Sequence, residues 1–216
     1  MGKTANNNVP VSVIRRLPRY YRYLSDMLLE GTYKISSLQL AKILGLTASQ
    51  IRQDLNHFGG FGHQGYGYNV EYLKNEIGKI LGTNRNYKLI IIGAGNLGSA
   101  ISNYQNLKKR GFSLVGVFDA DKKKVGEEIN GLCVLHVDTL EDFIKEHSPE
   151  IAVLTLPKPQ VPGMMQRLSE AGISGVWNFS YSDLEISSDI PIESVHLSDS
   201  LMMLSYKITE KANGEV

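Results

Sequence analysis

Three glycines and one aspartate are the residues of this chain whose types and spacing predict chemistry most directly. Gly93, Gly95 and Gly98 form a Gly-x-Gly-x-x-Gly pattern directly after the apolar run "LIII", and Asp119 follows 21 residues after Gly98. In such a pattern the first glycine permits a tight turn, the second lets the backbone approach a pyrophosphate, and the third allows a helix to pack closely on a strand. A carboxylate about 20 residues further on binds ribose hydroxyls. The sequence therefore predicts a dinucleotide site.

The predicted dinucleotide is NAD(H), because the carboxylate of Asp119 repels the 2′-phosphate that distinguishes NADP(H). Lys122, Lys123 and Lys124 follow closely and weaken this preference. Further contacts are expected from the glycine loop itself and from loops at the carboxyl ends of strands, where such folds bind their ligands. These residues are Ala94, Asn96, Leu97, Thr155, Pro157 and Asn178. A glycine-rich turn that binds nothing is the alternative that stays open.

The glycine pattern must be positioned by alternating strands and helices, and the second part of the chain has that pattern. Apolar runs typical of strands recur from Tyr87 onward, and helical segments separate most of them. The runs are "YKLIIIG", "FSLVGVFDA", "GLCVLHV", "IAVLTLP" and "GVWNFS". Because they are largely continuous, both faces of the sheet should be covered. We expect an α/β fold with a doubly wound parallel sheet, in which Cys133 is a small buried hydrophobe.

The N-terminal part reads as a winged helix-turn-helix. Ser36 and Gln39 have capping-box spacing before "SLQLAKIL", Gly45 ends that helix, and Thr47 opens "ASQIRQDLNHF". The glycine-rich stretch "GGFGHQGYGYNV" follows, and its alternating aromatics predict a hairpin wing. The residues expected in the packed interior of the two helices are Leu38, Ala41, Ile43, Leu46, Ile51 and Leu55.

The charge of the chain is divided unevenly between its two parts. Residues 1–70 contain eight Lys and Arg against three Asp and Glu, whereas residues 71–216 contain 15 against 19. A basic N-terminal part predicts a polyanionic partner, here DNA. Arg and Gln side chains on the second helix can read base edges, and other basic residues can contact phosphates. The candidate DNA contacts are Arg15, Arg16, Lys42, Ser49, Gln50, Arg52, Gln53, His63 and Gln64. A solvated or interdomain face is the alternative for the arginines at 15–22.

Several functional classes find no support in the sequence. No apolar run approaches the roughly 20 residues that span a bilayer, and "MGKTANNNVP" lacks the apolar segment of a secretory signal. A single cysteine fits a reducing cytoplasm. We find no metal-binding pattern and no catalytic cluster around the histidines, so we expect a regulator that is not an enzyme. Two other readings stay open: a small NAD-dependent dehydrogenase with an accessory domain, and a CoA-binding module.

These segments together resemble the Rex family of redox-sensing transcriptional repressors. The resemblance covers roughly residues 10–210 and includes "RLPRYYRYL", "ISSLQLAKILGLTASQIRQDLNHFGGFGHQGYGY", "LIIIGAGNLGSAI", "GFSLVGVFDAD", "GVWNFS" and "SDSLMMLSY". It implies three parts: a winged-helix DNA-binding domain over 1–83, a Rossmann NAD(H)-binding domain over 84–195 and a dimerisation helix over 196–216. That helix is expected to be swapped into the partner of a homodimer.

The resemblance also implies a mechanism. Members of this family bind a pseudo-palindromic operator when NADH is scarce relative to NAD+, and NADH releases the DNA, which controls genes of fermentation and NADH reoxidation. Tyr104, expected in the helix after the glycine loop, matches a family tyrosine near the nicotinamide and the dimer contacts. The chain departs from the family at the wing tip. Gln64 stands where a basic residue is usual, so His63 is expected to take over part of that contact.

Overall fold

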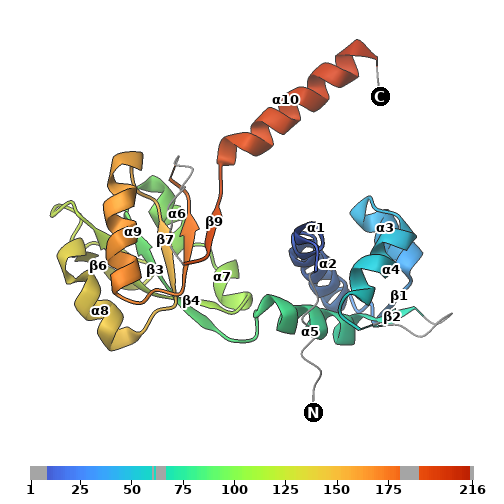
Figure 1. Cartoon of the computed structure of the whole chain (residues 1–216), viewed down its shortest axis with the longest axis horizontal. Coiled ribbons are helices and arrows are strands. Elements are labelled where there is room, and N and C mark those ends of the chain that lie inside the picture. Colours follow the sequence, from blue (N-terminus) through green and yellow to red (C-terminus); the bar gives the residue numbers. More distant parts are fainter. Residues whose placement is uncertain (1–8, 60, 62–66, 181–189, 215–216) are drawn as a thin grey trace. The chain divides into compact units, whose positions relative to one another are not determined.

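The computed structural model describes residues 9–59, 61, 67–180 and 190–214. The chain divides into two compact units, Met1–Arg85 and Asn86–Val216 (Figure 1). The finer division into 1–83, 84–195 and 196–216 stays a prediction. None of the helices in the described ranges is both long and apolar enough to cross a membrane.

The N-terminal unit combines a small helical core with a short antiparallel sheet. Pro18 stands in the first turn of the second helix, where its missing N–H costs nothing. That helix buries an apolar stripe at helical spacing, Leu17, Tyr20, Leu24 and Met27, and it packs on the last helix of the unit. The elements are α1 (Val11–Ile14), α2 (Leu17–Leu29), β1 (Lys34–Ile35), α3 (Ser37–Leu44), α4 (Ala48–Asn56), β2 (Tyr68–Asn69) and α5 (Val70–Leu81).

Helices α3 and α4 form the predicted helix-turn-helix. The hydroxyl of Ser36 accepts the Gln39 N–H while the Gln39 side chain accepts the Ser36 N–H, so the predicted capping box is confirmed. Gly45 ends α3 in the left-handed conformation, with φ of 64°, and Thr47 caps α4. The chain can therefore reverse direction in a short turn between the two helices.

Two residues expected inside this motif lie on its surface. Leu38 is 71% exposed and Ile43 is 41% exposed, whereas Leu40, Ala41 and Leu44 form the buried face of α3. The expectation was wrong because an eight-residue helix with apolar residues on several sides does not reveal which side meets the core.

The C-terminal unit is built around a seven-stranded sheet in the order β5-β6-β4-β3-β7-β8-β9. All neighbouring pairs are parallel except β5 with β6. The predicted doubly wound arrangement is confirmed, and the order reverses at β3, which lies between β4 and β7. The strands are β3 (Tyr87–Ile92), β4 (Phe112–Asp119), β5 (Glu128–Ile129), β6 (Leu132–His136), β7 (Ile151–Leu154), β8 (Gly175–Asn178) and β9 (Ile192–Ser194).

Helices cover this sheet from both sides (Figure 1). Ile90, Ile92 and Phe118 pack with the helices that follow β6 and β7, whereas Leu89 and Ile91 pack with the short helices that follow β3. The helices are α6 (Asn96–Ser102), α7 (Asn106–Lys109), α8 (Leu140–His147) and α9 (Val161–Glu170), with short 3-10 turns η1 (Val137–Thr139) and η2 (Lys158–Gln160), and the C-terminal α10 (Leu197–Asn213).

The connection between β4 and β6 contains no helix in the part of the chain that the structure describes. β4 and β6 are parallel, yet the described chain joins them through the short strand β5 instead of a crossover helix. Cys133 of β6 is exposed, which contradicts the expectation of a buried thiol, while its neighbour Val134 on the opposite face of the strand is 1% exposed. Near the other edge, Trp177 of β8 is the only tryptophan of the chain and packs edge-to-face on Phe179.

Candidate functional site

The glycine loop between β3 and α6 is held at the carboxyl ends of three strands. The Gly93 N–H donates to the carbonyl of Phe118 at 2.8 Å, and the Thr155 hydroxyl donates to the Gly93 carbonyl at 2.7 Å. Gly93 has a φ of +105°, which side-chain-bearing residues rarely adopt. A Cβ on Gly98 would lie 1.9 Å from the Gly93 oxygen. The fold itself therefore requires the first and third glycines of the pattern.

The middle glycine, Gly95, is not required by the fold. Gly95 has an ordinary φ of −74° at the start of α6, and a Cβ placed on it would meet no protein atom within 4 Å. Nothing in the described chain requires glycine at this position. A bare backbone that faces open space is what a pyrophosphate needs for close approach, so the loop fits the predicted dinucleotide.

Asp119 ends β4 beside this loop, as predicted. Its Oδ2 accepts the Ala94 N–H at 2.7 Å and the Lys124 ammonium at 3.2 Å, and its Oδ1 accepts the Asp121 N–H at 2.8 Å. Burial raises the pKa of the Asp119 carboxyl, but the hydrogen bonds from Asp121, Ala94 and Lys124 outweigh it, and the pKa is lowered overall. Asp119 is therefore a carboxylate at neutral pH and can accept hydrogen bonds only.

The remaining predicted contacts differ in how accessible they are. Asn96 and Pro157 are exposed, and Leu97 is half-buried. Thr155 supports the loop from β7 through its bond to the Gly93 carbonyl. Asn178 is fully buried, where its amide donates to the Ser194 hydroxyl and accepts the Ser180 N–H. The structure thus places Asn178 among groups that fix the end of β8, and its contact with a nicotinamide stays a prediction.

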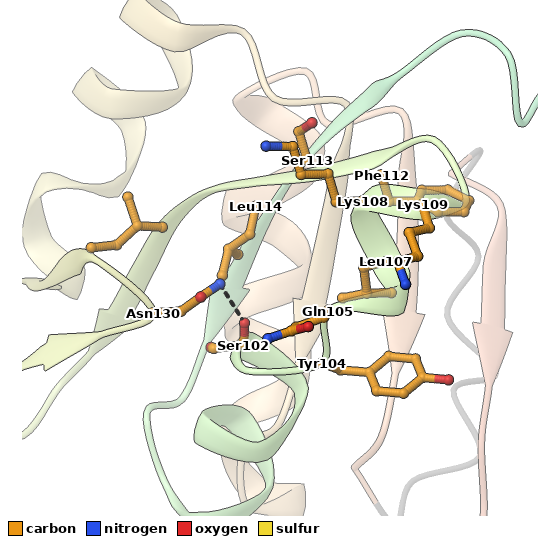
Figure 2. Close-up of a pocket in the computed structure, with 11 residues that line it drawn as sticks. Ser102, Tyr104, Gln105, Leu107, Lys108, Lys109, Phe112, Ser113, Leu114 and Asn130 are labelled. Carbon is orange, nitrogen blue, oxygen red and sulfur yellow. Dashed lines mark hydrogen bonds between the residues drawn. The ribbon is translucent and has the colours of Figure 1, made fainter.

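Tyr104 lies outside the helix in which it was expected. α6 ends at Ser102 and α7 begins at Asn106, so Tyr104 stands in the connection between them with its side chain half exposed. Figure 2 shows it at the rim of a hollow of about 820 Å³ formed by α7, β4 and Asn130. Neither the glycine loop nor Asp119 lines this hollow, so it is a separate feature of the unit.

The N-terminal unit presents most of the predicted DNA contacts to solvent. Arg15, Lys42 and Gln53 are exposed, and Gln50 is half-buried. Ser49 and Arg52, three positions apart on α4, are exposed as well. The Arg52 guanidinium donates to the hydroxyl of Ser37 at the start of α3, which holds it across the two helices. His63 and Gln64 lie outside the described residues.

Arg16 is held by an interaction that the sequence reading missed. Its guanidinium forms a forked ion pair with Asp54 of α4, with both N–O distances at 2.7 Å, and the Tyr20 hydroxyl donates to the same carboxylate. The Asp54 side chain is 3% exposed. The pKa of the Tyr20 hydroxyl is raised well above its usual value. Burial is the largest cause, and the hydrogen bond to Asp54 is the second. Asp54 lies on the same face of α4 as Ile51 and Leu55, and an acid on an apolar face was the available signal.

Arg16 thus ties α4 to the N-terminal helices. Its predicted contact with a DNA phosphate stays a prediction. Among the described residues no group of three or more His, Cys, Asp and Glu side chains is placed to hold a metal ion.

Two family models match this chain. Residues 8–56 match the family described as "Putative DNA-binding protein N-terminus", and residues 84–181 match the family described as "CoA binding domain". They cover the helix-turn-helix and most of the sheet unit respectively. The first agrees with the predicted DNA-binding domain, and the second with a nucleotide-binding Rossmann fold.

Full-length relatives are also similar to the chain. The redox-sensing transcriptional repressor Rex of Clostridioides difficile (strain 630) is 53% identical over 95% of this chain and 98% of its own length. The repressor of the same name from Caldicellulosiruptor saccharolyticus is 50% identical over 94% and 93%. These relatives are named as repressors and not as enzymes, as the sequence predicted.

Solved structures agree with these relatives. The chain is similar to RSP in complex with beta-NAD+ and operator DNA, with a TM-score of 0.88, 49% identity and 97% of both chains covered. It is also similar to RSP in complex with beta-NADH, with a TM-score of 0.89, 47% identity and coverage of 97% and 99%. Identity near one half over nearly the whole of both chains settles the family. This chain belongs to the Rex family of redox-sensing transcriptional repressors.

Proposed function

We propose that this protein represses transcription by binding operator DNA through its N-terminal unit, and that NADH bound to its C-terminal unit releases the DNA. The observation that carries the proposal is the open space at Gly95 beside Asp119, in a chain whose N-terminal unit contains a helix-turn-helix. The complexes of RSP with beta-NAD+ and operator DNA and with beta-NADH support it.

The glycine loop and Asp119 would hold the dinucleotide. Backbone atoms of 93–98 would lie along the pyrophosphate, and Asp119 would accept hydrogen bonds from the adenosine ribose. The bound dinucleotide supplies a redox signal, because its nicotinamide ring is charged in the oxidised form and neutral in the reduced form. Thr155 and Pro157, at the end of β7, and Tyr104 are the residues we assign to the nicotinamide half of the site.

On the DNA side, α4 is the helix we assign to the major groove. Arg52 and Gln53 would read base edges, with Ser49 and Gln50 nearby, while Arg15 and Lys42 would contact phosphates. Arg16 would act through α4, since its guanidinium is committed to Asp54. A partly palindromic operator requires two copies of α4 related by twofold symmetry, and therefore a dimer.

Helix α10 is the surface we assign to that dimer. Its apolar side chains are all more than half exposed, and none is buried by the described chain: Leu197, Leu201, Met202, Met203, Leu204, Tyr206 and Ile208. An apolar surface of this extent needs a partner. We propose that the helix, within residues 196–216, is exchanged with a second copy. Replacement of Leu201 and Leu204 by Lys should convert the dimer to a monomer in sedimentation equilibrium and abolish operator binding.

The compartment that fits this function is the cytoplasm, where a bacterial chromosome and the NADH pool are both accessible. The regulated genes would be those of fermentation and NADH reoxidation. Their products restore NAD+ and would be needed when NADH accumulates.

The direct test is a gel shift with operator DNA of the kind bound by RSP, with NADH, NAD+ and CoA titrated separately. We expect NADH to release the DNA at concentrations at which NAD+ and CoA do not. Operator binding that none of the three changes would refute the sensing role. Release by CoA alone would instead assign the sheet unit to the ligand of the family model that it matches.

A further inference from the structure

Lys124 is placed against the residue that we assign to the adenosine ribose. Its Nζ lies 3.2 Å from Oδ2 of Asp119, and the two side chains are 33% and 13% exposed. Lys122 and Lys123 precede it in the same turn, and both are exposed. One lysine of three neighbours therefore reaches into the site.

The hydrogen bonds that Asp119 already accepts leave few acceptor positions for the hydroxyls of a ribose. A carboxylate has about four lone-pair positions, two on each oxygen. Oδ2 already accepts from the Ala94 N–H and from Lys124, and Oδ1 accepts from the Asp121 N–H. Two ribose hydroxyls need two positions, and one of the three donors must therefore yield. The backbone donors are fixed by the glycine loop and the turn, so Lys124 is the donor that can move.

The charges at this point also bear on the choice of dinucleotide. A 2′-phosphate adds a charge of about −1.5 to −2 beside the carboxylate. Asp119 alone would repel it strongly, but the ammonium of Lys124 offsets part of that repulsion at a half-buried position where charges are incompletely screened.

We propose that Lys124 sets how strictly this site prefers NADH to NADPH: it competes with the ribose for Asp119 and lowers the repulsion of a 2′-phosphate. The inference rests on the proposed function, because it assumes that the dinucleotide binds beside Asp119. It adds that the preference for the unphosphorylated cofactor belongs to the Asp119–Lys124 pair and not to the aspartate alone.

The test compares Lys124→Met with Lys123→Met in the full-length protein. Both variants lose one positive charge from the same turn. Lys123 is exposed, and among the described residues its hydrogen bond is made by its backbone N–H, to Asp121. Affinities for NADH and NADPH are measured by titration calorimetry. We expect the NADPH affinity of Lys124→Met to fall about fivefold or more relative to NADH, with an unchanged or tighter NADH affinity. Lys123→Met should keep the wild-type ratio.

A second pair of variants makes the test independent of weak NADPH binding by the wild type. Asp119→Asn should raise the NADPH-to-NADH affinity ratio, because it removes the repelling charge and releases Lys124. The double variant Asp119→Asn with Lys124→Met should lose about fivefold or more of that gain. That loss would show that Lys124 acts on the 2′-phosphate directly.

The outcomes separate the two proposals. If wild-type protein binds NADH but Lys124→Met has the same ratio as Lys123→Met, the role of Lys124 is refuted and the sensing function stands. If Lys124→Met weakens NADH and NADPH equally, Lys124 only holds the turn, and the inference is again refuted. If the wild type binds neither dinucleotide, the proposed function itself fails.

Discussion

In the N-terminal unit the residues assigned to ligand contact are exposed side chains, most of them on α4, whereas in the C-terminal unit they are mainly backbone groups that glycines leave bare. Ser49 and Arg52 stand on the exposed side of a helix whose other side, with Ile51 and Leu55, is buried. In the glycine loop the same short segment must both approach a ligand and pack between β4 and β7.

Residues that bind a ligand and residues that stabilise the fold are therefore separated differently in the two units. On α4 an exposed contact residue such as Ser49 or Arg52 can be replaced without changing the buried face of the helix. In the glycine loop, two glycines three positions apart have different roles. Gly98 serves the fold, while Gly95 stands over open space. Substitutions at the two glycines should therefore differ in kind.

The largest effect is expected for Gly98→Ala. The new methyl would lie 1.9 Å from the Gly93 carbonyl oxygen and 2.9 Å from the Thr155 hydroxyl, so the loop backbone must shift. We expect a loss of at least about 3 kcal/mol in the free energy of unfolding of this unit. NADH binding should be lost as well. Urea denaturation followed by circular dichroism measures the first, and an unchanged midpoint would contradict this account of Gly98.

Asp54→Ala should come next and should affect the other unit. It leaves the Arg16 guanidinium and the buried Tyr20 hydroxyl without their shared acceptor. Because Arg16 is 25% exposed and can partly reach water, we expect a loss of about 2–3 kcal/mol and not the full cost of a buried orphan charge. Thermal unfolding measures it, with exposed Asp26→Ala as the control. Equal stability of the two variants would show that the ion pair contributes nothing.

Gly95→Ala is the matched counterpart of Gly98→Ala. The backbone at Gly95 is in a region that alanine adopts, and its Cβ would meet no protein atom. Stability should change by less than about 1 kcal/mol, whereas NADH affinity should fall by about thirtyfold, because the methyl would occupy the space assigned to the pyrophosphate. Calorimetric titration with NADH decides the matter. Wild-type affinity in this variant would place the dinucleotide elsewhere.

The smallest effect is expected for Arg52→Ala on α4. It removes one side chain that can read a base, and it leaves the buried face intact. Operator affinity should fall by about tenfold, while loss of the exposed hydrogen bond to Ser37 should lower stability by less than about 1 kcal/mol. Fluorescence anisotropy with labelled operator measures the affinity. Lys42→Ala serves as the comparison, since loss of a phosphate contact should lower affinity for all sequences alike and reduce the salt dependence.

Much of the fold could be predicted because local signals and global pattern agreed. The caps at Ser36 and Thr47 are local hydrogen bonds between neighbouring residues, and the structure contains both. The continuous apolar strands placed Gly93 and Asp119 at the ends of adjacent parallel strands. Such features depend on a few consecutive residues and on one simple topology, and a single sequence is enough to find them.

What could not be predicted depends on contacts between distant segments. Arg16 and Asp54 are 38 positions apart, and no local pattern pairs them. Cys133 is exposed although its neighbour Val134 is buried, and an apolar run does not reveal which of its side chains meet the core. The sequence does not distinguish Lys124 from its two lysine neighbours, but the turn after β4 directs it toward Asp119. Each of these errors concerns which side of an element faces a partner.

The single tryptophan of this chain gives the protein an optical property of its own. Trp177 belongs to β8, one position before Asn178, and its ring packs on Phe179 in the unit that we assign to NADH. Reduced nicotinamide absorbs light in the range where tryptophan emits, and the oxidised form does not. Bound NADH should therefore quench the emission of Trp177 by energy transfer while NAD+ leaves it bright. The unlabelled protein would then report the redox state of the dinucleotide it holds.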